Sequence, residues 1–270
     1  MFDLPRILAG LALSVLIGGL AYHRGSLTRG GWLGAIITGT CTFGFGGWTW
    51  GVALIVFFVT SSALSHFRRS HKERVAGEKF EKGGRRDLGQ ALANGGPGAA
   101  LALAYALSGE PAVLLAGFAG VMATVNADTW ATELGVLAAR RPRLVTTLQP
   151  VPAGTSGGIT AAGTLASAAG ALLIGVVVLA AYALERGPWE LPLVPAALLG
   201  GLAGSLADSL LGATVQAMYA SAAGETERPM AHDGTPHPLV RGWRWMTNDM
   251  VNALSSLAGG LVAAAVWLAA

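Results

Sequence analysis

The stretch "AVLLAGFAGVMATVNADTWATELGVL", residues 112–137, has the length of a membrane span but contains acidic side chains. Its first half is apolar, and its second half holds Asn126, Asp128 and Glu133. A carboxylate at the centre of a bilayer costs roughly 2.5 kcal/mol or more. The segment therefore predicts a transmembrane helix whose acidic residues require a functional or structural reason.

The composition around this stretch is that of an integral membrane protein. Of the 270 residues, 53% are hydrophobic and 12% are charged, whereas soluble domains carry about 25% charged residues. Cys41 is the only cysteine, which excludes an intramolecular disulfide. The pI of 9.4 is accounted for by basic residues that flank the expected spans, so we expect no nucleic-acid partner.

A membrane-crossing helix needs about 20 mostly apolar residues. This criterion predicts about eight spans, near residues 5–22, 31–46, 49–66, 88–108, 112–137, 158–184, 192–219 and 248–270. The first lacks the basic start and cleavage site of a signal peptide, so we interpret it as a span. The second is short and rich in Gly and Thr, which favours a half-buried or broken helix. The expected fold is an all-α polytopic bundle that forms a single membrane domain over residues 1–270.

The basic residues are distributed unevenly between the two sides of this bundle. All Lys and Arg residues other than Arg6 and Arg186 lie near residues 22–30, 67–87, 138–157 and 220–247. With eight spans, these four segments share one side, which the positive-inside rule places in the cytoplasm. We therefore expect a protein of the inner (cytoplasmic) membrane, with both termini outside and with cytoplasmic loops at the last three segments.

Polar residues recur at the cytoplasmic ends of the expected spans. They form five groups, at residues 85–98, 126–135, 152–164, 204–216 and 248–256. Scattered structural polar residues would have no reason to share one side. Their convergence predicts an active site or binding site that opens to the cytoplasm.

The acidic residues of these groups are the expected catalytic and metal-binding residues, namely Asp128, Glu133 and Asp208. On an ideal helix Asp128 lies about 140° from Glu133, so that span is either buried on several sides or distorted. Asp208 lies on a face of small residues that could be a packing seam, but a seam does not require a carboxylate. Acidic and amide oxygens suit Mg²⁺. The alternative is a buried acid paired with an Arg in a structural network.

The segment "PAGTSGGITAAGT", residues 152–164, suggests an anion site. Its glycines let the backbone approach a ligand closely, and its Thr and Ser are good helix-cap residues. Its backbone amides would lie at the N-terminus of the sixth span, where they could bind an anion. The alternative is an ordinary glycine-rich helix start with basic residues set by topology. No Walker A pattern occurs, which excludes a P-loop. The expected nucleotide- and phosphate-binding residues are Arg85, Arg86, Arg140, Gly154, Thr155, Ser156, Gly157 and Gly158.

A further set of polar residues is expected to support the site, although helix packing would also explain them. Several recur at helical spacing and so share one face. They are Gln90, Asn94, Asn126, Thr129, Ser205, Ser209, Gln216, Asn248 and Asn252. His232 and His237 lack close metal-ligand spacing, and we interpret them as loop residues.

The motifs "GRRDLGQALANGG", "NADTWATELG", "GTSGGIT", "GSLADSLLGATVQ" and "NDMVN" resemble those of one widespread integral membrane family. That family, formerly of unknown function, includes a human transmembrane protein and the plant phytyl-phosphate kinase of vitamin E synthesis. The match runs in the same order over most of the chain. The resemblance implies a kinase that transfers a phosphoryl group from a nucleoside triphosphate, with CTP as the expected donor, to an isoprenoid monophosphate at the cytoplasmic face.

Two other functions remain open at this point. A transporter or channel for a small anion or lipid would also carry intramembrane acids and broken helices, but the polar groups gather at one face and no inverted repeat is evident. A cytidylyltransferase-like lipid enzyme would use similar metal and phosphate sites. In the kinase, Mg²⁺ is the expected cofactor, and the lipid would enter sideways between glycine-rich spans. The oligomeric state stays open.

Overall fold

The computed structural model describes residues 3–76, 84–222, 224–231 and 233–270. In these residues eight long helices form the body of the protein, which confirms the expected all-α polytopic bundle. They are α1 (Leu4–His23), α2 (Arg29–Gly46), α3 (Trp48–His66), α5 (Leu88–Leu107), α6 (Ala112–Gly135), α7 (Ala161–Arg186), α8 (Leu193–Thr214) and α9 (Asn248–Ala269). Six are long and apolar enough to cross a membrane. The other two, α2 and α5, do not meet this criterion of length and hydropathy.

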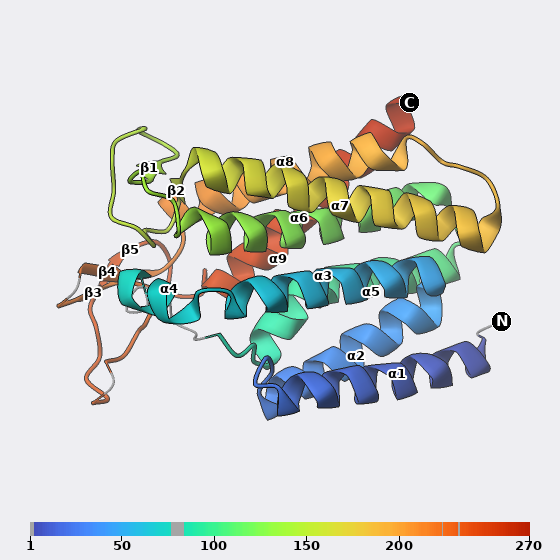
Figure 1. Cartoon of the computed structure of the whole chain (residues 1–270), viewed down its shortest axis with the longest axis horizontal. Coiled ribbons are helices and arrows are strands. Elements are labelled where there is room, and N and C mark those ends of the chain that lie inside the picture. The colour runs from blue at the N-terminus through green and yellow to red at the C-terminus, as the bar shows by residue number, and fades with distance from the viewer. Residues whose placement is uncertain (1–2, 77–83, 223, 232) are drawn as a thin grey trace.

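The two ends of the bundle differ (Figure 1). Both termini lie at one end, and the opposite end carries α4 (Arg69–Ala76) and all the strands. We call this second end the loop end; it consists of the described residues of segments 24–28, 67–87, 136–160 and 215–247. The structure thus gathers the four basic segments at one end. Lys79, Lys82 and His232 lie outside the described residues.

Two segments that the sequence suggested were plain loops form small antiparallel sheets. One pairs β1 (Arg143–Leu144) with β2 (Gly158–Ile159), and the other has the order β4–β3–β5. Its strands are β3 (Met218–Ser221), β4 (Gly224–Thr226) and β5 (Leu239–Arg241). The predicted end of the seventh span, at residue 219, is therefore wrong, since α8 stops at Thr214. It stops because the chain beyond it pairs elsewhere: Trp243 N donates to Val215 O (3.0 Å) and Ala217 N donates to Met246 O (2.9 Å).

The structure decides between the alternatives for two spans. Helix α2 is continuous and half-buried rather than broken; the hydroxyl of Thr28 caps it by accepting a hydrogen bond from Gly31 N at 3.0 Å. Helix α6 is continuous from Ala112 to Gly135, and every residue from Leu115 to Ala127 is buried. It packs against α3, α5, α7, α8 and α9, so side chains on several of its faces point into protein.

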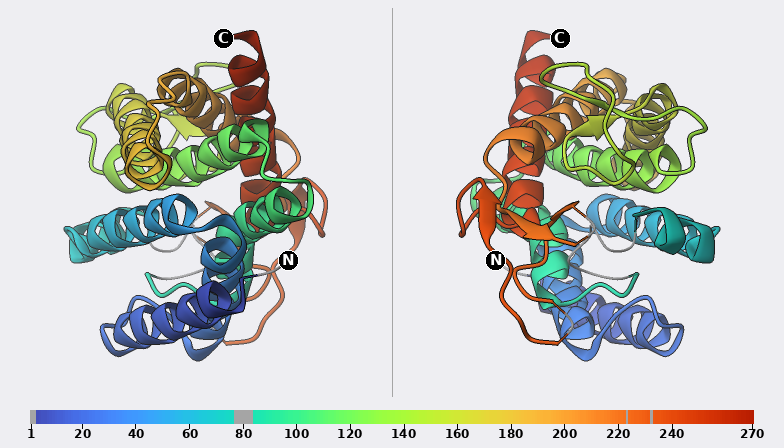
Figure 2. Two further views of the ribbon diagram at one scale, coloured as in Figure 1. Left: turned by 90° about the vertical axis from the view of Figure 1, so that its right-hand side faces the viewer. Right: turned by 90° about the vertical axis from the view of Figure 1, so that its left-hand side faces the viewer.

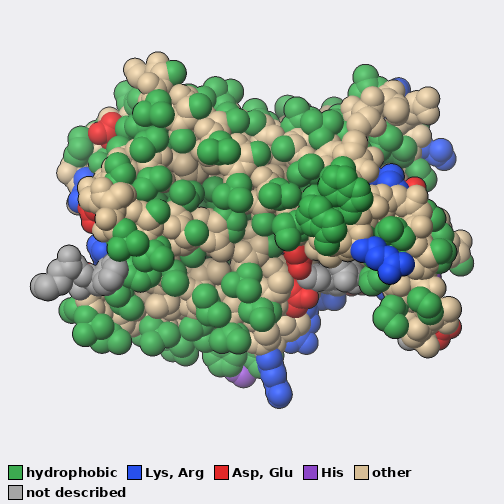
Figure 3. Space-filling model, turned by 180° about the vertical axis from the view of Figure 1, so that it is seen from behind, with side chains coloured by type: hydrophobic (Ala, Val, Ile, Leu, Met, Phe, Trp, Pro, Cys, Tyr) green, Lys and Arg blue, Asp and Glu red, His purple; other side chains and the backbone are tan. Residues whose placement is uncertain are grey.

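The outer surface of the bundle is apolar. Hydrophobic side chains cover the flank shown in Figure 3, and charged side chains lie mainly toward the two ends. Exposed apolar residues such as Leu16, Leu165 and Leu261 belong to helices long enough to span. Helices α5 and α9 cross the others obliquely (Figures 1 and 2). This surface is suited to contact with membrane lipids.

Helices α6, α8 and α9 meet at a crossing built from small residues. The hydroxyl of Thr124 in α6 donates to Gly120 O (2.9 Å) and to Gly200 O of α8 (3.3 Å). A Cβ added at Gly259 of α9 would lie 2.0 Å from Thr124 Oγ1 and 2.6 Å from Gly200 O. The crossing therefore has no room for a methyl group at Gly259, which sets how closely the three helices approach.

Replacement of Gly259 by Ala tests this close crossing. We expect Gly259→Ala to lower the free energy of unfolding by about 1–3 kcal/mol through overpacking. The matched control is Gly96→Ala in α5, where an added Cβ meets nothing within 4 Å and where Ala gains about 0.5–1 kcal/mol of helix propensity. Thermal unfolding of the purified variants in detergent measures both. Equal melting temperatures for the two variants would contradict the proposed packing.

Candidate functional site

A small polar cavity lies at the loop-end half of the bundle, between α5, α6 and α9. Its volume is about 20 Å³, which is room for about one water molecule or ion. The residues that line it are Asn94, Thr124, Val125, Asp128, Thr129, Asn252 and Ser255. Nearly all of these side chains offer oxygen atoms. The cavity is thus suited to a small, hard, polar ligand.

Asp208 of α8 lies next to this cavity, close to Asp128. Ser255 Oγ donates a hydrogen bond to Asp208 Oδ2 at 3.0 Å, and Ser255 itself lines the cavity. The carboxylates of Asp128 and Asp208 lie close enough for their charges to repel each other. Two of the three acids predicted from the sequence are therefore neighbours, although they come from different helices.

The N-terminal caps of α5 and α9 determine where the cavity residues of these two helices lie. At the start of α5, Asp87 and Gln90 form a capping box, in which Gln90 N donates to Asp87 Oδ1 (2.9 Å) and Asp87 N donates to Gln90 Oε1 (3.3 Å). This uses Gln90 for capping and places Asn94 one turn further along the helix. At the start of α9, Thr247 caps the helix, so that Asn252 and Ser255 follow on one face.

A third carboxylate, Glu227, reaches the same region from the segment after β4. Gln216 Nε2 donates to Glu227 Oε1 (2.8 Å), and the charge of Glu227 acts on Asp128. Gln216 Oε1 in turn accepts from Ser156 Oγ (2.8 Å). Glu227 was not predicted as a site residue, because an acid in an irregular segment follows no helical or strand periodicity.

Glu133, the third acid predicted to bind metal, lies elsewhere. Its carboxylate accepts a hydrogen bond from Ser65 Oγ of α3 (2.5 Å) and forms an ion pair with Lys72 of α4. The structure therefore does not bring Asp128, Glu133 and Asp208 together. Glu133 fits the alternative of a partly buried acid in a structural network, with Lys in place of the expected Arg.

The acidic residues fit a metal site that substrate phosphates and water complete, rather than one formed by protein ligands alone. Within the described part of the chain, no three His, Cys, Asp or Glu side chains are grouped so that they could hold an ion. Mg²⁺ is usually bound by one or two carboxylates together with substrate phosphates and several waters. Asp128 and Asp208, with amide and hydroxyl oxygens beside them, supply such a donor set.

The glycine-rich turn at 154–158 is not placed at a helix N-terminus, contrary to prediction. Strand β2 separates it from α7, whose cap is Thr160, with Thr160 Oγ1 accepting from Gly163 N at 2.9 Å. Gly157 has a φ of +80° and packs on α8, where an added Cβ would lie 2.7 Å from Ser209 O. Close packing on α8 thus explains this glycine, and Thr155 and Ser156 are not helix caps.

The three arginines predicted to bind phosphate have different surroundings. Arg85 is exposed and donates to Leu27 O at 3.0 Å, and Arg140 is exposed beyond the end of α6. Arg86 is partly buried, donates to Ser62 Oγ at 3.0 Å and lies 5.7 Å from the centres of the Phe57 and Phe58 rings. Burial lowers the pKa of Arg86 to about 10, opposed by the charge of Glu133, so this guanidinium is still charged at neutral pH.

The supporting residues divide by position. Asn94, Thr129 and Asn252 line the polar cavity, and Asn248 is the first residue of α9. Asn126 instead joins helices, since its Nδ2 donates to Gly170 O (2.8 Å) and its Oδ1 accepts from Thr60 Oγ1 (3.1 Å). Ser205 is buried on α8, and Ser209 lies under the 154–158 turn. Packing therefore accounts for part of this set.

Comparison with known proteins gives the chain relatives in plants, archaea and bacteria. Residues 12–260 match the family described as integral membrane protein DUF92. The chain is 34% identical to Protein PGR of Arabidopsis thaliana in an alignment of 271 positions that covers 93% of each chain. It is 32% identical to an uncharacterized membrane protein of Methanocaldococcus jannaschii over 213 residues, covering 79% of this chain and 84% of that protein. A third relative, from Synechocystis, is also an uncharacterized membrane protein, 28% identical over 88% of this chain and 81% of its own length.

A more distant relative is Protein VTE6, chloroplastic, of Arabidopsis thaliana. The two are 25% identical over 241 residues, which cover 88% of this chain and 64% of that protein. No solved structure matches the chain.

Acid-to-amide substitutions separate the two kinds of acid. We expect Asp128→Asn and Asp208→Asn each to weaken Mg²⁺ or Mn²⁺ binding by about a hundredfold, because each removes a charged ligand. Glu133→Gln should leave metal affinity unchanged and lower stability by about 1–3 kcal/mol, since Lys72 loses its counter-charge. Calorimetric titration with Mn²⁺ and thermal unfolding measure the two effects. Loss of metal affinity in Glu133→Gln alone would reverse the assignment.

Proposed function

Because the chain belongs to the DUF92 family of integral membrane proteins, as its match over residues 12–260 shows, we propose that it is a membrane-embedded lipid kinase. It transfers a phosphoryl group from a nucleoside triphosphate to an isoprenoid monophosphate. The class of substrate, and CTP as the donor, rest on the resemblance of its motifs to the plant phytyl-phosphate kinase.

The observation that carries this proposal is the pairing of Asp128 and Asp208 beside a polar cavity. Two ionised carboxylates that repel each other within a membrane bundle are unfavourable unless a cation or a proton offsets their charge. The relay from Ser156 through Gln216 to Glu227 adds a third negative charge at the loop end. Such a concentration of negative charge favours binding of a divalent cation together with the phosphates of a nucleotide.

The reaction needs positioning and charge neutralisation rather than a strong base. An oxygen of the acceptor monophosphate attacks the γ-phosphorus, and the bond from that phosphorus to the oxygen of the leaving nucleoside diphosphate breaks. The attacking oxygen is already anionic, so no His is required to remove a proton. Mg²⁺ held by Asp128 and Asp208 would neutralise charge on the donor phosphates. Arg86 supplies a fixed positive charge near the loop end for the acceptor.

In this proposal the loop end faces the cytoplasm of a cell whose inner membrane contains the protein, and both termini lie outside. Support comes from the basic residues, which concentrate at the loop end and are nearly absent from the other end. Nucleoside triphosphates are cytoplasmic, so the acid pair would open toward its donor.

A direct assay tests the kinase. Purified protein is incubated with geranylgeranyl or phytyl monophosphate, Mg²⁺ and each nucleoside triphosphate in turn. We expect prenyl diphosphate and a nucleoside diphosphate, with CTP the best donor, and a loss of kcat by about a hundredfold or more in Asp128→Asn and Asp208→Asn. The control is Glu73→Gln, an exposed acid of α4, which should keep full activity.

Other outcomes of the same assay identify the alternatives. A nucleotide–lipid adduct with release of pyrophosphate would indicate nucleotidyl transfer. If no nucleotide is consumed or bound, the kinase proposal fails, and uptake of anions or lipids into proteoliposomes would test transport. The continuous α6 and the position of the acids near one end favour an enzyme over a transporter.

Cysteine labelling tests the orientation. In a Cys41→Ser background, Arg141→Cys lies at the loop end, and Pro188→Cys lies in the α7–α8 connection; both positions are exposed. A membrane-impermeant maleimide added to intact cells should label Pro188→Cys, and should label Arg141→Cys only after the membrane is permeabilised. The reverse pattern would place the loop end outside the cell.

A further inference from the structure

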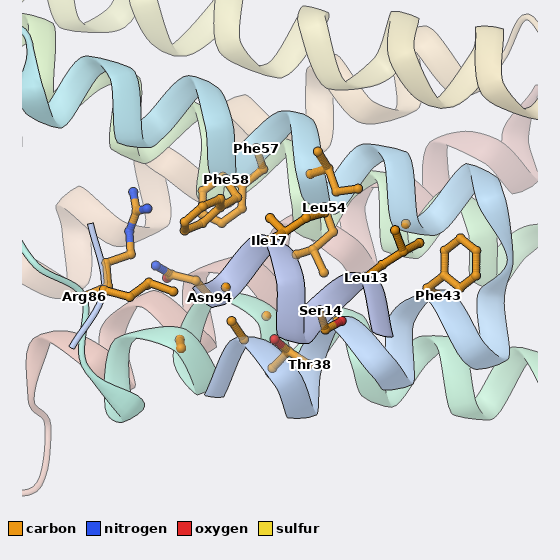
Figure 4. Close-up of a pocket in the computed structure, with 18 of the residues that line it drawn as sticks. Leu13, Ser14, Ile17, Thr38, Phe43, Leu54, Phe57, Phe58, Arg86 and Asn94 are labelled. Atoms are coloured by element: carbon orange, nitrogen blue, oxygen red, sulfur yellow. The ribbon is translucent and has the colours of Figure 1, made fainter. Parts of the chain in front are cut away.

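A second cavity lies beside the polar one, between α1, α2, α3 and α5. Its volume is about 100 Å³. Apolar side chains form most of its wall, among them Leu13 and Ile17 of α1 and Leu54 and Phe58 of α3. Figure 4 shows Arg86 at one end of this pocket and Phe43 at the other. The pocket is therefore hydrophobic along its length and cationic at the end nearest the loops.

The cation at this end is held in place by its backbone. Arg86 N donates to Ser26 O (3.0 Å), and Arg86 O accepts from Thr28 N (2.9 Å), so the turn between α1 and α2 fixes the residue. Among the described residues its guanidinium donates only to Ser62 Oγ. A guanidinium has five N–H donors, so several can still bind an anion.

Asn94 connects the two cavities. It lines the apolar pocket together with Arg86 and Gln90, and it also lines the polar cavity with Asp128. Figure 4 shows the amide of Asn94 near the Arg86 end of the pocket. An anion bound between Arg86 and Asn94 is therefore one side chain away from the site of the acids.

We propose that this pocket binds the head end of a single-chain isoprenoid monophosphate, with the phosphate at Arg86 and Asn94 and the first isoprene unit against Ile17, Leu54 and Phe58. This assignment rests on the proposed kinase function for the identity of the lipid. It adds the binding site, the side from which the substrate enters and the residues that select it.

The dimensions of the pocket favour one chain. A cavity of 150 Å³ holds a benzene molecule, so about 100 Å³ accommodates roughly one five-carbon unit and has no room for two acyl chains side by side. Helix α1 packs mainly on α2 and contributes little direct packing with α3. The remainder of the chain can therefore leave sideways between α1 and α3, toward the lipid.

Photolabelling in the absence of nucleotide and Mg²⁺ tests the site independently of catalysis. The full chain in nanodiscs is irradiated with a geranylgeranyl monophosphate analogue that carries a diazirine on its first isoprene unit. We expect labels in the peptides that contain Ile17 and Leu54. Geranylgeranyl monophosphate should compete, while geranylgeraniol, inorganic phosphate and two-chain phosphatidic acid should each compete at least about tenfold less well.

Paired variants identify the contacts. Ile17→Trp fills the pocket and should reduce labelling about tenfold, whereas Leu16→Trp, at the neighbouring residue that is 69% exposed, should not. Leu54→Phe repeats the test from α3 in case Ile17→Trp fails to fold. Arg86→Gln should remove the preference for the monophosphate over the alcohol, and the exposed control Arg69→Gln should retain it.

The outcomes separate this inference from the kinase proposal. Specific labelling without any phosphoryl transfer would keep the lipid site and overturn the kinase. Phosphoryl transfer with an unchanged KM in Ile17→Trp and Leu54→Phe would keep the kinase and overturn the site. Equal competition by phosphatidic acid would make the pocket a general lipid site and would also overturn the inference.

Discussion

Two like charges held inside a membrane bundle are the constraint on which the rest of this structure depends. Asp128 and Asp208 repel each other in surroundings where charge is poorly solvated. Such a pair is tolerated when hydrogen-bond donors and a cation are at hand. Ser255 is one such donor, and the polar cavity is the place for the cation.

Close packing of the helices opposes this repulsion. Asp128 and Asp208 are brought together by the packing of α6, α8 and α9. These helices cross at the small residues Gly200, Gly259 and Thr124. In a bilayer, helices associate through close van der Waals contact rather than through the hydrophobic effect. Small residues at the crossing therefore provide the attraction that holds the carboxylates near each other.

The sequence was sufficient for the helices because length and apolarity determine a span, and for the polar end because charges avoid the bilayer. It was also sufficient to predict that Asp128, Asp208, Asn94 and Asn252 lie near one another, because their helical positions place them at a similar depth; what they bind stays a prediction. That prediction depends only on the position of a residue along its helix. The rotation of the helix about its axis decides which neighbouring helix the side chain faces. Glu133 lies five residues beyond Asp128 and faces α3 and α4 instead.

Tertiary contacts decided what local patterns could not. The turn at 154–158 has the composition of an anion site, but its glycine packs on α8. Glu227 follows no local sequence pattern, and a hydrogen bond from Gln216 helps to hold it near the other acids. The alternative explanation for the acids of α6 was an ion pair with an Arg in a structural network. Glu133 does form an ion pair, but with Lys72, since the short helix α4 brings that residue to α6.

The turn between α1 and α2 joins two events that would otherwise be independent. It forms the loop end of the helix that walls the apolar pocket, and its backbone is hydrogen-bonded to Arg86 on both sides. Any displacement of the loop end of α1 would therefore be passed to the backbone of Arg86 through these two hydrogen bonds. The wall of the apolar pocket and the position of its positive charge are thus coupled through the backbone.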